Sequence, residues 1–196
     1  MPLVMEQCIK RLLRHSKPDR NYGPVQRKAA VAITLREIDG DIRILMIRRA
    51  VRQGDPWSGH MGFPGGRRDP EDHSNLACAK RETIEEIGLD LEENAELIVE
   101  LGDVNTGWRP DRPEMLVTPY VFRLNASHDP KLVLNYEVDG VVWVPLAFLL
   151  DKGNRIPLKW EWRGEKVESD SYLYKGNRIW GLSLMMLDEL IEAVER

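Results

Sequence analysis

The chain has 196 residues, with 28 lysines and arginines against 32 aspartates and glutamates, which gives a formal net charge of -4. This length predicts one compact domain, and 42% hydrophobic with 31% charged residues is typical of a folded globular protein rather than a fibrous or disordered one. The slight acidic excess argues against a dedicated nucleic-acid binder, and no stretch approaches the ~20 apolar residues of a membrane helix. We therefore expect neither nucleic acid nor membrane as a partner.

The cysteines and the first residues bear on location. Cys8 and Cys78 are too few and too far apart in the sequence for a disulfide framework. The N-terminal stretch lacks the continuous apolar core of a signal peptide. These features favour a reducing, cytoplasmic setting, with Cys78 as a buried small apolar group.

The first part of the chain is predicted to contain a helix and a β-hairpin. Apolar residues recur at helical spacing over 3–15, and a linker with proline and glycine follows up to residue 26. Segments 27–37 and 41–49 have the composition of strands, and Asp39-Gly40 between them is typical of a tight hairpin turn.

The middle of the chain combines a long loop with a helix. Residues 50–74 are rich in Gly, Pro, Arg and Asp, and a loop of this length inside a domain is usually functional or disordered. The loop leads into a helix over 75–87, with Gly88 as its C-cap. Mixed strands and helices predict an α/β sandwich around one sheet. Further predicted elements are strands at 95–104, 114–124 and 139–146, a hairpin within 158–176, and a C-terminal helix within 178–195.

The helix over 75–87 carries three glutamates in an unfavourable arrangement. On a helical wheel, Glu82 and Glu86 lie about 40° apart and Glu85 lies about 60° further round. Like charges at this spacing repel, and the helix dipole disfavours acids in the last turns. Such a local conflict indicates a functional site. The side of the helix predicted to face the core holds Leu76, Thr83, Ile84 and Ile87.

A divalent cation would remove this conflict. Mg²⁺ prefers oxygen ligands, and the Gly65-Gly66 pair lets the backbone approach a ligand closely. Arg81 lies four residues before Glu85 and is placed to hold that carboxylate in one rotamer. Taken singly, an acid-rich flank is more often a solvated surface, and a Gly-Gly pair is more often a turn. Their occurrence together favours a metal site.

The run from Gly66 to Leu89 resembles the Nudix box, most specifically at Arg81-Glu82-Thr83-Ile84-Glu85-Glu86-Ile87-Gly88-Leu89. The span from Gly66 to Arg81 is one residue longer than in the commonest box. Asp72 therefore stands at the upstream acid position in place of a glutamate, and its role is left open. Four further stretches resemble the coenzyme A pyrophosphatase branch, although Asp55 stands where that branch would have a basic residue: 44–49, 59–66, 141–146 and 178–183.

The resemblance implies a fold and a reaction. Residues 27–196 would form a Nudix-type α/β/α sandwich around a mixed β-sheet, preceded by an N-terminal helix and linker over 1–26. The protein would hydrolyse the pyrophosphate of a small-molecule nucleotide, most closely coenzyme A or an acyl-CoA, giving 3',5'-ADP and a 4'-phosphopantetheine. Two alternatives stay open: another nucleotide substrate (ADP-ribose, a dinucleotide or an oxidised nucleoside triphosphate), or a nucleotide-binding module without catalysis. A homodimer is a family-level expectation.

The resemblance also implies roles for individual residues, with Mg²⁺ or Mn²⁺ as the cofactor. Glu82 and Glu86 would be the principal metal ligands, Glu85 would contribute directly or through water, and Gly65 would offer its carbonyl. Glu85 and Glu86 thereby also count as catalytic. The general base would come from outside the box, from Glu137 or from Glu114, although an exposed loop acid is an equally good interpretation of either. Candidate contacts to substrate phosphates are Gly66, Arg48, Arg49 and Arg67, with Arg52 and Arg68 as further cations nearby.

Overall fold

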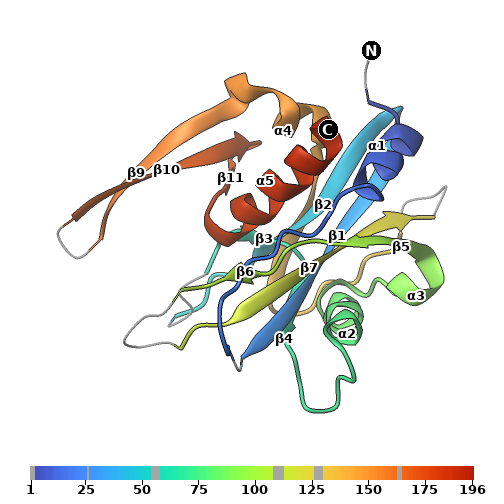
Figure 1. Cartoon of the computed structure of the whole chain (residues 1–196), viewed down its shortest axis with the longest axis horizontal. Helices are drawn as coiled ribbons and strands as arrows, with labels where there is room; N and C mark the ends of the chain where they lie inside the picture. The colour runs from blue at the N-terminus through green and yellow to red at the C-terminus, as the bar shows by residue number, and fades with distance from the viewer. Residues whose placement is uncertain (1–2, 26, 54–57, 108–112, 126–129, 163–164) are drawn as a thin grey trace.

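A mixed sheet of eight strands forms the centre of the molecule (Figure 1). The computed structural model describes residues 3–25, 27–53, 58–107, 113–125, 130–162 and 165–196, without the side chains of 160–162 and 165. The strand order is β3-β2-β1-β7-β5, with β4 also paired to β1, β6 to β7 and β8 to β2. Only the β1–β7 pair is parallel among these pairs. The strands are β1 (Lys28–Ile38), β2 (Asp41–Arg49), β3 (Met61–Gly62), β4 (Gly65–Arg67), β5 (Ala95–Glu100), β6 (Val104–Asn105), β7 (Leu116–Leu124) and β8 (Val138–Pro145).

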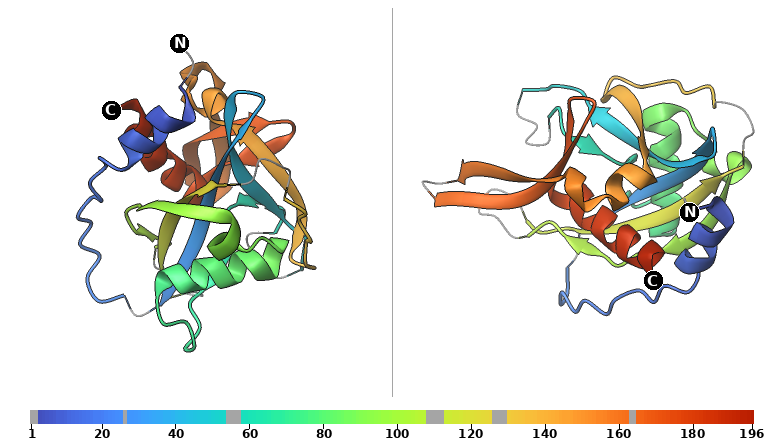
Figure 2. Two further views of the ribbon diagram at one scale, coloured as in Figure 1. Left: turned by 90° about the vertical axis from the view of Figure 1, so that its right-hand side faces the viewer. Right: turned by 90° about the horizontal axis from the view of Figure 1, so that it is seen from above.

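Helices cover both faces of this sheet (Figure 2). On one face, α2 (Asn75–Ile87) packs through Cys78, Ala79 and Ile87 against the even-numbered apolar residues of β1. On the other face, α1 and α5 pack against the odd-numbered ones. A strand that buries both of its faces must be apolar almost throughout, as β1 is. The predicted α/β/α sandwich around a mixed sheet is confirmed. The other helices are α1 (Met5–Leu12), α3 (Leu91–Asn94), α4 (Leu146–Leu150), η1 (Lys152–Asn154) and α5 (Gly181–Glu195).

The predicted hairpin between β1 and β2 is confirmed. Both turn residues have positive φ, 54° at Asp39 and 80° at Gly40. This is the conformation of the two-residue turn whose twist matches that of antiparallel strands, and Asp-Gly is one of the few pairs that adopt it readily. The turn therefore fixes the register of β1 on β2.

A second, three-stranded antiparallel sheet forms an arm that projects from the main body (Figures 1 and 2). It consists of β9 (Arg155–Trp162), β10 (Glu165–Tyr174) and β11 (Asn177–Ile179). The predicted hairpin is confirmed, but it starts earlier. The predicted C-terminal helix starts later, at Gly181, because residues 177–179 pair with β10 instead.

Three other boundaries differ from prediction. The loop over 50–74 contains β3 and β4, whose few residues pair with β2 and β1. The predicted strand over 95–104 is divided into β5 and β6 by residues 101–103. The N-terminal helix ends at Leu12 rather than residue 15, because Arg14 and His15 donate to carbonyls three residues back in a tighter turn. Each difference arises from strand pairing or turn geometry, which the hydrophobic periodicity of the sequence does not predict.

The segment before β1 is bound to the C-terminal helix. The Glu189 carboxylate of α5 is buried and accepts a hydrogen bond from Gly102 N at 2.6 Å. His15 Nε2 lies 3.1 Å from Glu189 Oε1, and Arg20 Nη2 lies 2.8 Å from Oε2. The buried Glu189 carboxylate therefore links three segments of the chain: the linker, α5 and residues 101–103. The domain boundary at 26/27 stays a prediction.

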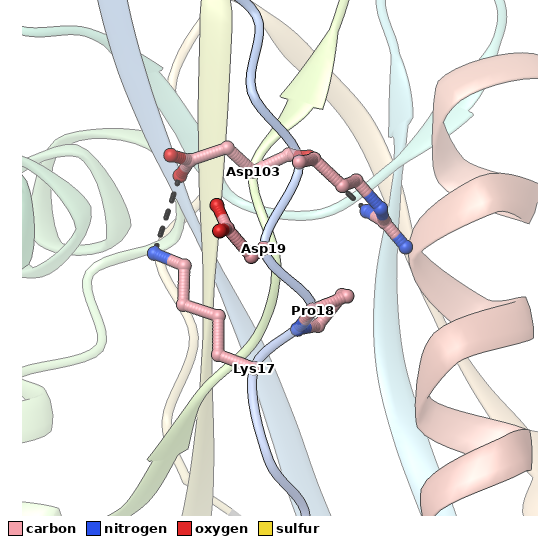
Figure 3. Close-up of a pocket in the computed structure, with 5 residues that line it drawn as sticks. Lys17, Pro18, Asp19 and Asp103 are labelled. Carbon is pink, nitrogen blue, oxygen red and sulfur yellow. Dashed lines mark hydrogen bonds and ion pairs between the residues drawn. The ribbon is translucent and has the colours of Figure 1, made fainter.

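A pocket on the linker extends this contact (Figure 3). It is lined by Lys17, Pro18, Asp19, Arg20 and Asp103. Lys17 Nζ lies 3.7 Å from Asp103 Oδ1, and Arg20 Nη1 donates to the Asp103 carbonyl at 3.1 Å. These charged groups hold the linker against the main body and include no predicted site residue. No helix in the described ranges is both long enough and apolar enough to cross a membrane.

Candidate active site

Helix α2 is defined at both ends by local chemistry. Ser74 caps the N-terminus, where its Oγ accepts a hydrogen bond from Ala77 N at 3.0 Å. Gly88 ends the helix in the left-handed conformation (φ 69°), and its N–H donates to Ile84 O at 2.8 Å. The predicted bounds of 75–87 and the predicted glycine cap are confirmed. Glu82, Glu85 and Glu86 therefore lie in the last two turns of α2.

The predicted core face of α2 is wrong at one position. Thr83 and Ile87 are fully buried and Leu76 packs against the core, as expected. Ile84 is 45% exposed, whereas Glu86 is only 2% exposed. The reason is that the buried side of the helix is turned toward β4, which brings Glu86 against the glycine pair.

The glycines of β4 allow this close approach. A side chain at Gly65 would overlap the carbonyl oxygen of Ala30, and Gly65 has φ of 153°, where other residues are strained. A Cβ at Gly66 would overlap the carboxyl group of Glu82. Gly65 is therefore needed for β4 to lie against β1, and Gly66 leaves the space that the Glu82 carboxyl group occupies.

Glu86 is the most buried of the three glutamates. Its Oε2 accepts a hydrogen bond from Gly65 N at 2.9 Å. Burial raises the pKa of Glu86 to about 7; the Gly65 hydrogen bond opposes the shift, while the negative charge of Glu82 adds to it. Gly65 thus contacts Glu86 through its N–H, and its predicted role as a carbonyl ligand stays a prediction.

Glu82 and Glu85 both form an ion pair with Arg81. Arg81 Nη1 lies 3.0 Å from Glu82 Oε1 and 3.1 Å from Glu85 Oε2. Burial raises the pKa of Glu82, an effect that the Arg81 charge opposes. Glu85 is far more exposed than the other two. The expected contact between Arg81 and Glu85 is present, and it reaches Glu82 as well.

Asp72, whose role the sequence leaves open, is the partner that fixes Arg81. Arg81 Nε donates to Asp72 Oδ1 at 3.0 Å and Nη2 donates to Oδ2 at 2.8 Å, a two-point contact. These hydrogen bonds lower the pKa of Asp72 to about 2. Arg68 donates twice to the Asp72 carbonyl, and Asp69 N donates to Asp72 Oδ2. The loop before α2 is thereby folded around one aspartate, which absorbs the extra residue of the box.

The donor set fits a hard divalent cation. Among the described residues, no group of three or more His, Cys, Asp or Glu side chains is already arranged around a common point. The Glu86 carboxylate is nevertheless buried and the Glu82 side chain is only 17% exposed. Burial and the negative charge of Glu82 both make ionisation of Glu86 costly, and both raise its pKa. A cation between such oxygens would remove both costs. The residues therefore suit Mg²⁺ or Mn²⁺, and Glu85 is close enough along the helix to join them.

Of the two predicted general bases, the structure brings Glu137 to the site. Asn135 N donates to the Glu86 carbonyl at 2.9 Å, and Glu137 follows two residues later, where its charge contributes to the raised pKa of Glu86. Arg52 Nη1 donates to Glu137 Oε1 at 3.2 Å. Glu114 instead accepts a hydrogen bond from Asn105 Nδ2 at 3.1 Å.

The predicted phosphate-binding arginines separate into different environments. The charge of Arg49 lowers the pKa of Glu86, against the larger effect of burial. Arg48 pairs with Asp139, Nε to Oδ2 at 2.9 Å. The Arg67 side chain is exposed, and its carbonyl accepts from Arg81 Nη2 at 3.2 Å. Asp55, which stands where the coenzyme A pyrophosphatase branch would have a basic residue, lies outside the described residues.

Comparison with known proteins identifies the family of the chain. The NUDIX domain model matches residues 26–162, more than half of the sequence, and the chain therefore belongs to the NUDIX domain family. It is 34% identical to the mitochondrial Nudix hydrolase 15 of Arabidopsis thaliana over 178 residues, 87% of this chain and 58% of that protein. It is 30% identical to the human mitochondrial coenzyme A diphosphatase NUDT8 over 164 residues, 82% of this chain and 66% of that protein. The chain thus spans less than two thirds of each relative.

Solved structures agree on the fold. The crystal structure of a MutT/nudix family protein from Enterococcus faecalis matches with a TM-score of 0.55 and 19% identity, over 98% of this chain and 70% of that one. At this identity the likeness supports the architecture alone.

Proposed function

We propose that the protein is a divalent-metal-dependent hydrolase that splits the pyrophosphate linkage of a nucleoside diphosphate derivative. The observation that carries the proposal is a pair of carboxylates on α2 held against Gly65 and Gly66: Glu86, which is buried, and Glu82, whose side chain is 17% exposed. We assign Mg²⁺ or Mn²⁺ to these two glutamates, with Glu85 and the Gly65 carbonyl as further ligands.

The residues around the carboxylates fit this chemistry. A bound divalent cation would neutralise charge on the pyrophosphate oxygens and lower the pKa of a bound water. Glu137 would accept a proton from the attacking water, whose oxygen bonds to one phosphorus as the bond from that phosphorus to the bridging oxygen breaks. Arg49, whose charge already acts on Glu86, and the exposed Arg67 would contact substrate phosphates.

For the substrate we propose coenzyme A or an acyl-CoA, with 3',5'-ADP and a 4'-phosphopantetheine as products. The support is the human relative named a coenzyme A diphosphatase, at 30% identity. ADP-ribose, dinucleotides and oxidised nucleoside triphosphates are the competing substrates. A homodimer and a cytoplasmic location are further proposals; light scattering and fractionation of cells test them.

The reaction is tested by incubating the purified protein with each candidate substrate and Mg²⁺ or Mn²⁺, and by identifying the products by phosphorus NMR. We expect coenzyme A to be split at the pyrophosphate and Glu86→Gln to be inactive while keeping the wild-type circular dichroism. Glu71→Gln removes an exposed carboxylate from the adjoining loop and should leave turnover unchanged. Unchanged turnover in Glu86→Gln would refute the proposed function, whereas a different preferred substrate would refute only the coenzyme A assignment.

A further inference from the structure

An exposed tyrosine lies next to the candidate general base. Tyr136 precedes Glu137 in the loop 130–137, and 78% of its surface is exposed. Tyrosine is enriched at binding surfaces because its ring is apolar and its hydroxyl group is polar. The neighbours of Tyr136 show how the ring is held.

Arg52 supports one side of the Tyr136 ring. Its Cζ lies 4.3 Å from the ring centroid, and its Nη2 donates to the Tyr136 carbonyl at 3.0 Å. The same guanidinium donates through Nη1 to Glu137, and the Arg52 N–H donates to Ser58 Oγ at 2.6 Å. A cation over the face of an aromatic ring is attracted by its π-electrons. Arg52 therefore holds the ring and the carboxylate in one rigid group, and most of the ring is left exposed.

Backbone hydrogen bonds fix this group relative to helix α2. Asn135 N donates to the Glu86 carbonyl and Val133 N donates to the Ile87 carbonyl, each at 2.9 Å. The loop thus satisfies two carbonyls of the last helical turn, which have no partner within the helix. Tyr136 is thereby held one residue from Glu137, the proposed general base, and a nucleotide carries its base one sugar away from its first phosphate.

We propose that Tyr136, supported by Arg52, stacks on the nucleobase of the substrate and selects nucleotides with a purine base. The proposal rests on the proposed function, because it requires a nucleotide bound at Glu86. Stacking of a base on an aromatic side chain changes binding by about 5- to 150-fold. A purine presents a larger π-face than a pyrimidine and gains more from this contact. Tyr136 is a specificity-determining residue, and Arg52 is a positioning residue that acts through it.

Binding of AMP tests the proposal without requiring hydrolysis. Saturation-transfer NMR, with EDTA present, measures the affinities of the full chain for AMP, UMP and ribose 5-phosphate. Ribose 5-phosphate has no base and serves as the control ligand. We expect the wild type to bind AMP more tightly than UMP. Tyr136→Ala should lower the affinity for AMP at least about fivefold and leave the affinity for ribose 5-phosphate unchanged. Tyr136→Phe keeps the ring and should bind AMP like the wild type. Leu134→Ala, an exposed position in the same loop, should also leave AMP binding unchanged.

Three results would overturn the proposal. These are unchanged AMP binding in Tyr136→Ala, equal weakening of AMP and ribose 5-phosphate, and equal affinity of the wild type for AMP and UMP. With a hydrolysed substrate, Tyr136→Ala should raise KM and leave kcat nearly unchanged, because stacking contributes equally in ground and transition states. A wild-type protein that binds AMP through Tyr136 but hydrolyses nothing would refute the proposed function and support the stacking.

Discussion

The contact between Asp72 and Arg81 is expected to be a large local contributor to stability, and Asp72→Asn should destabilise the protein by about 2 kcal/mol near neutral pH. The Asp72 side chain is 6% exposed and accepts two hydrogen bonds from one guanidinium. Asparagine offers one acceptor and turns an N–H toward the cation. The replacement therefore removes one charge-assisted hydrogen bond and places an amide N–H opposite a guanidinium N–H, so that two donors face each other.

The pKa of Asp72 gives the same magnitude independently. It lies at about 2 in the folded protein, and an unfolded aspartate has a pKa of about 3.9, so the difference corresponds to about 2.5 kcal/mol. Partial exposure of Arg81 reduces this to about 2 kcal/mol. Because the folded pKa is the lower one, the stabilisation is complete above about pH 4 to 5 and is lost as the pH falls toward 2.

Urea unfolding followed by circular dichroism, at several values between about pH 7 and about pH 3, checks both the size and the direction. The difference in unfolding free energy between wild type and Asp72→Asn should shrink toward the acid end. Asp139→Asn is the matched control, since its pair with Arg48 is 55% exposed on the carboxylate side and should contribute well under about 1 kcal/mol. A difference that stays constant with pH, or equals that of the control, would refute the reasoning.

Three further outcomes are expected. Because the pKa of Glu86 is about 7 when folded and about 4.3 when unfolded, the metal-free wild type loses up to about 3.7 kcal/mol of stability as the pH rises through that window. Glu86→Gln should therefore raise Tm by several degrees in EDTA near pH 8, as calorimetry would show, and added Mg²⁺ should stabilise only the wild type. Gly66→Ala should lower kcat/KM about 100-fold by displacing Glu82. Burial raises the pKa of Cys8 to about 11 and of Cys78 to about 12, so a thiol reagent near pH 8 should label neither until urea is added.

Features set by a few neighbouring residues were predictable from the sequence. The Asp39-Gly40 turn and the Gly88 cap follow from backbone conformations that few residues adopt. The placement of Glu82 and Glu86 on one flank of the helix follows from its period alone. These signals locate the candidate site before any tertiary contact is known.

Features set by contacts across the fold were not predictable in this way. The exposure of Ile84 depends on how α2 is rotated against β4, a choice made by Glu86 and the glycines of that strand. The role of Asp72 depends on a loop that folds back to Arg81. Short strands such as β3 carry too few residues for a periodic pattern. In each case packing decides between local alternatives of similar energy.

The way the loop 130–137 is fastened to α2 has a consequence for divergence among related enzymes. Its bonds to the helix use the backbone N–H groups of Val133 and Asn135, so they survive exchange of most side chains at those positions. Side chains such as those of Leu134 and Tyr136 can therefore be exchanged while α2 keeps its neighbouring loop in place. In such an arrangement the surface that the loop presents can change without disturbing the helix that carries Glu82, Glu85 and Glu86.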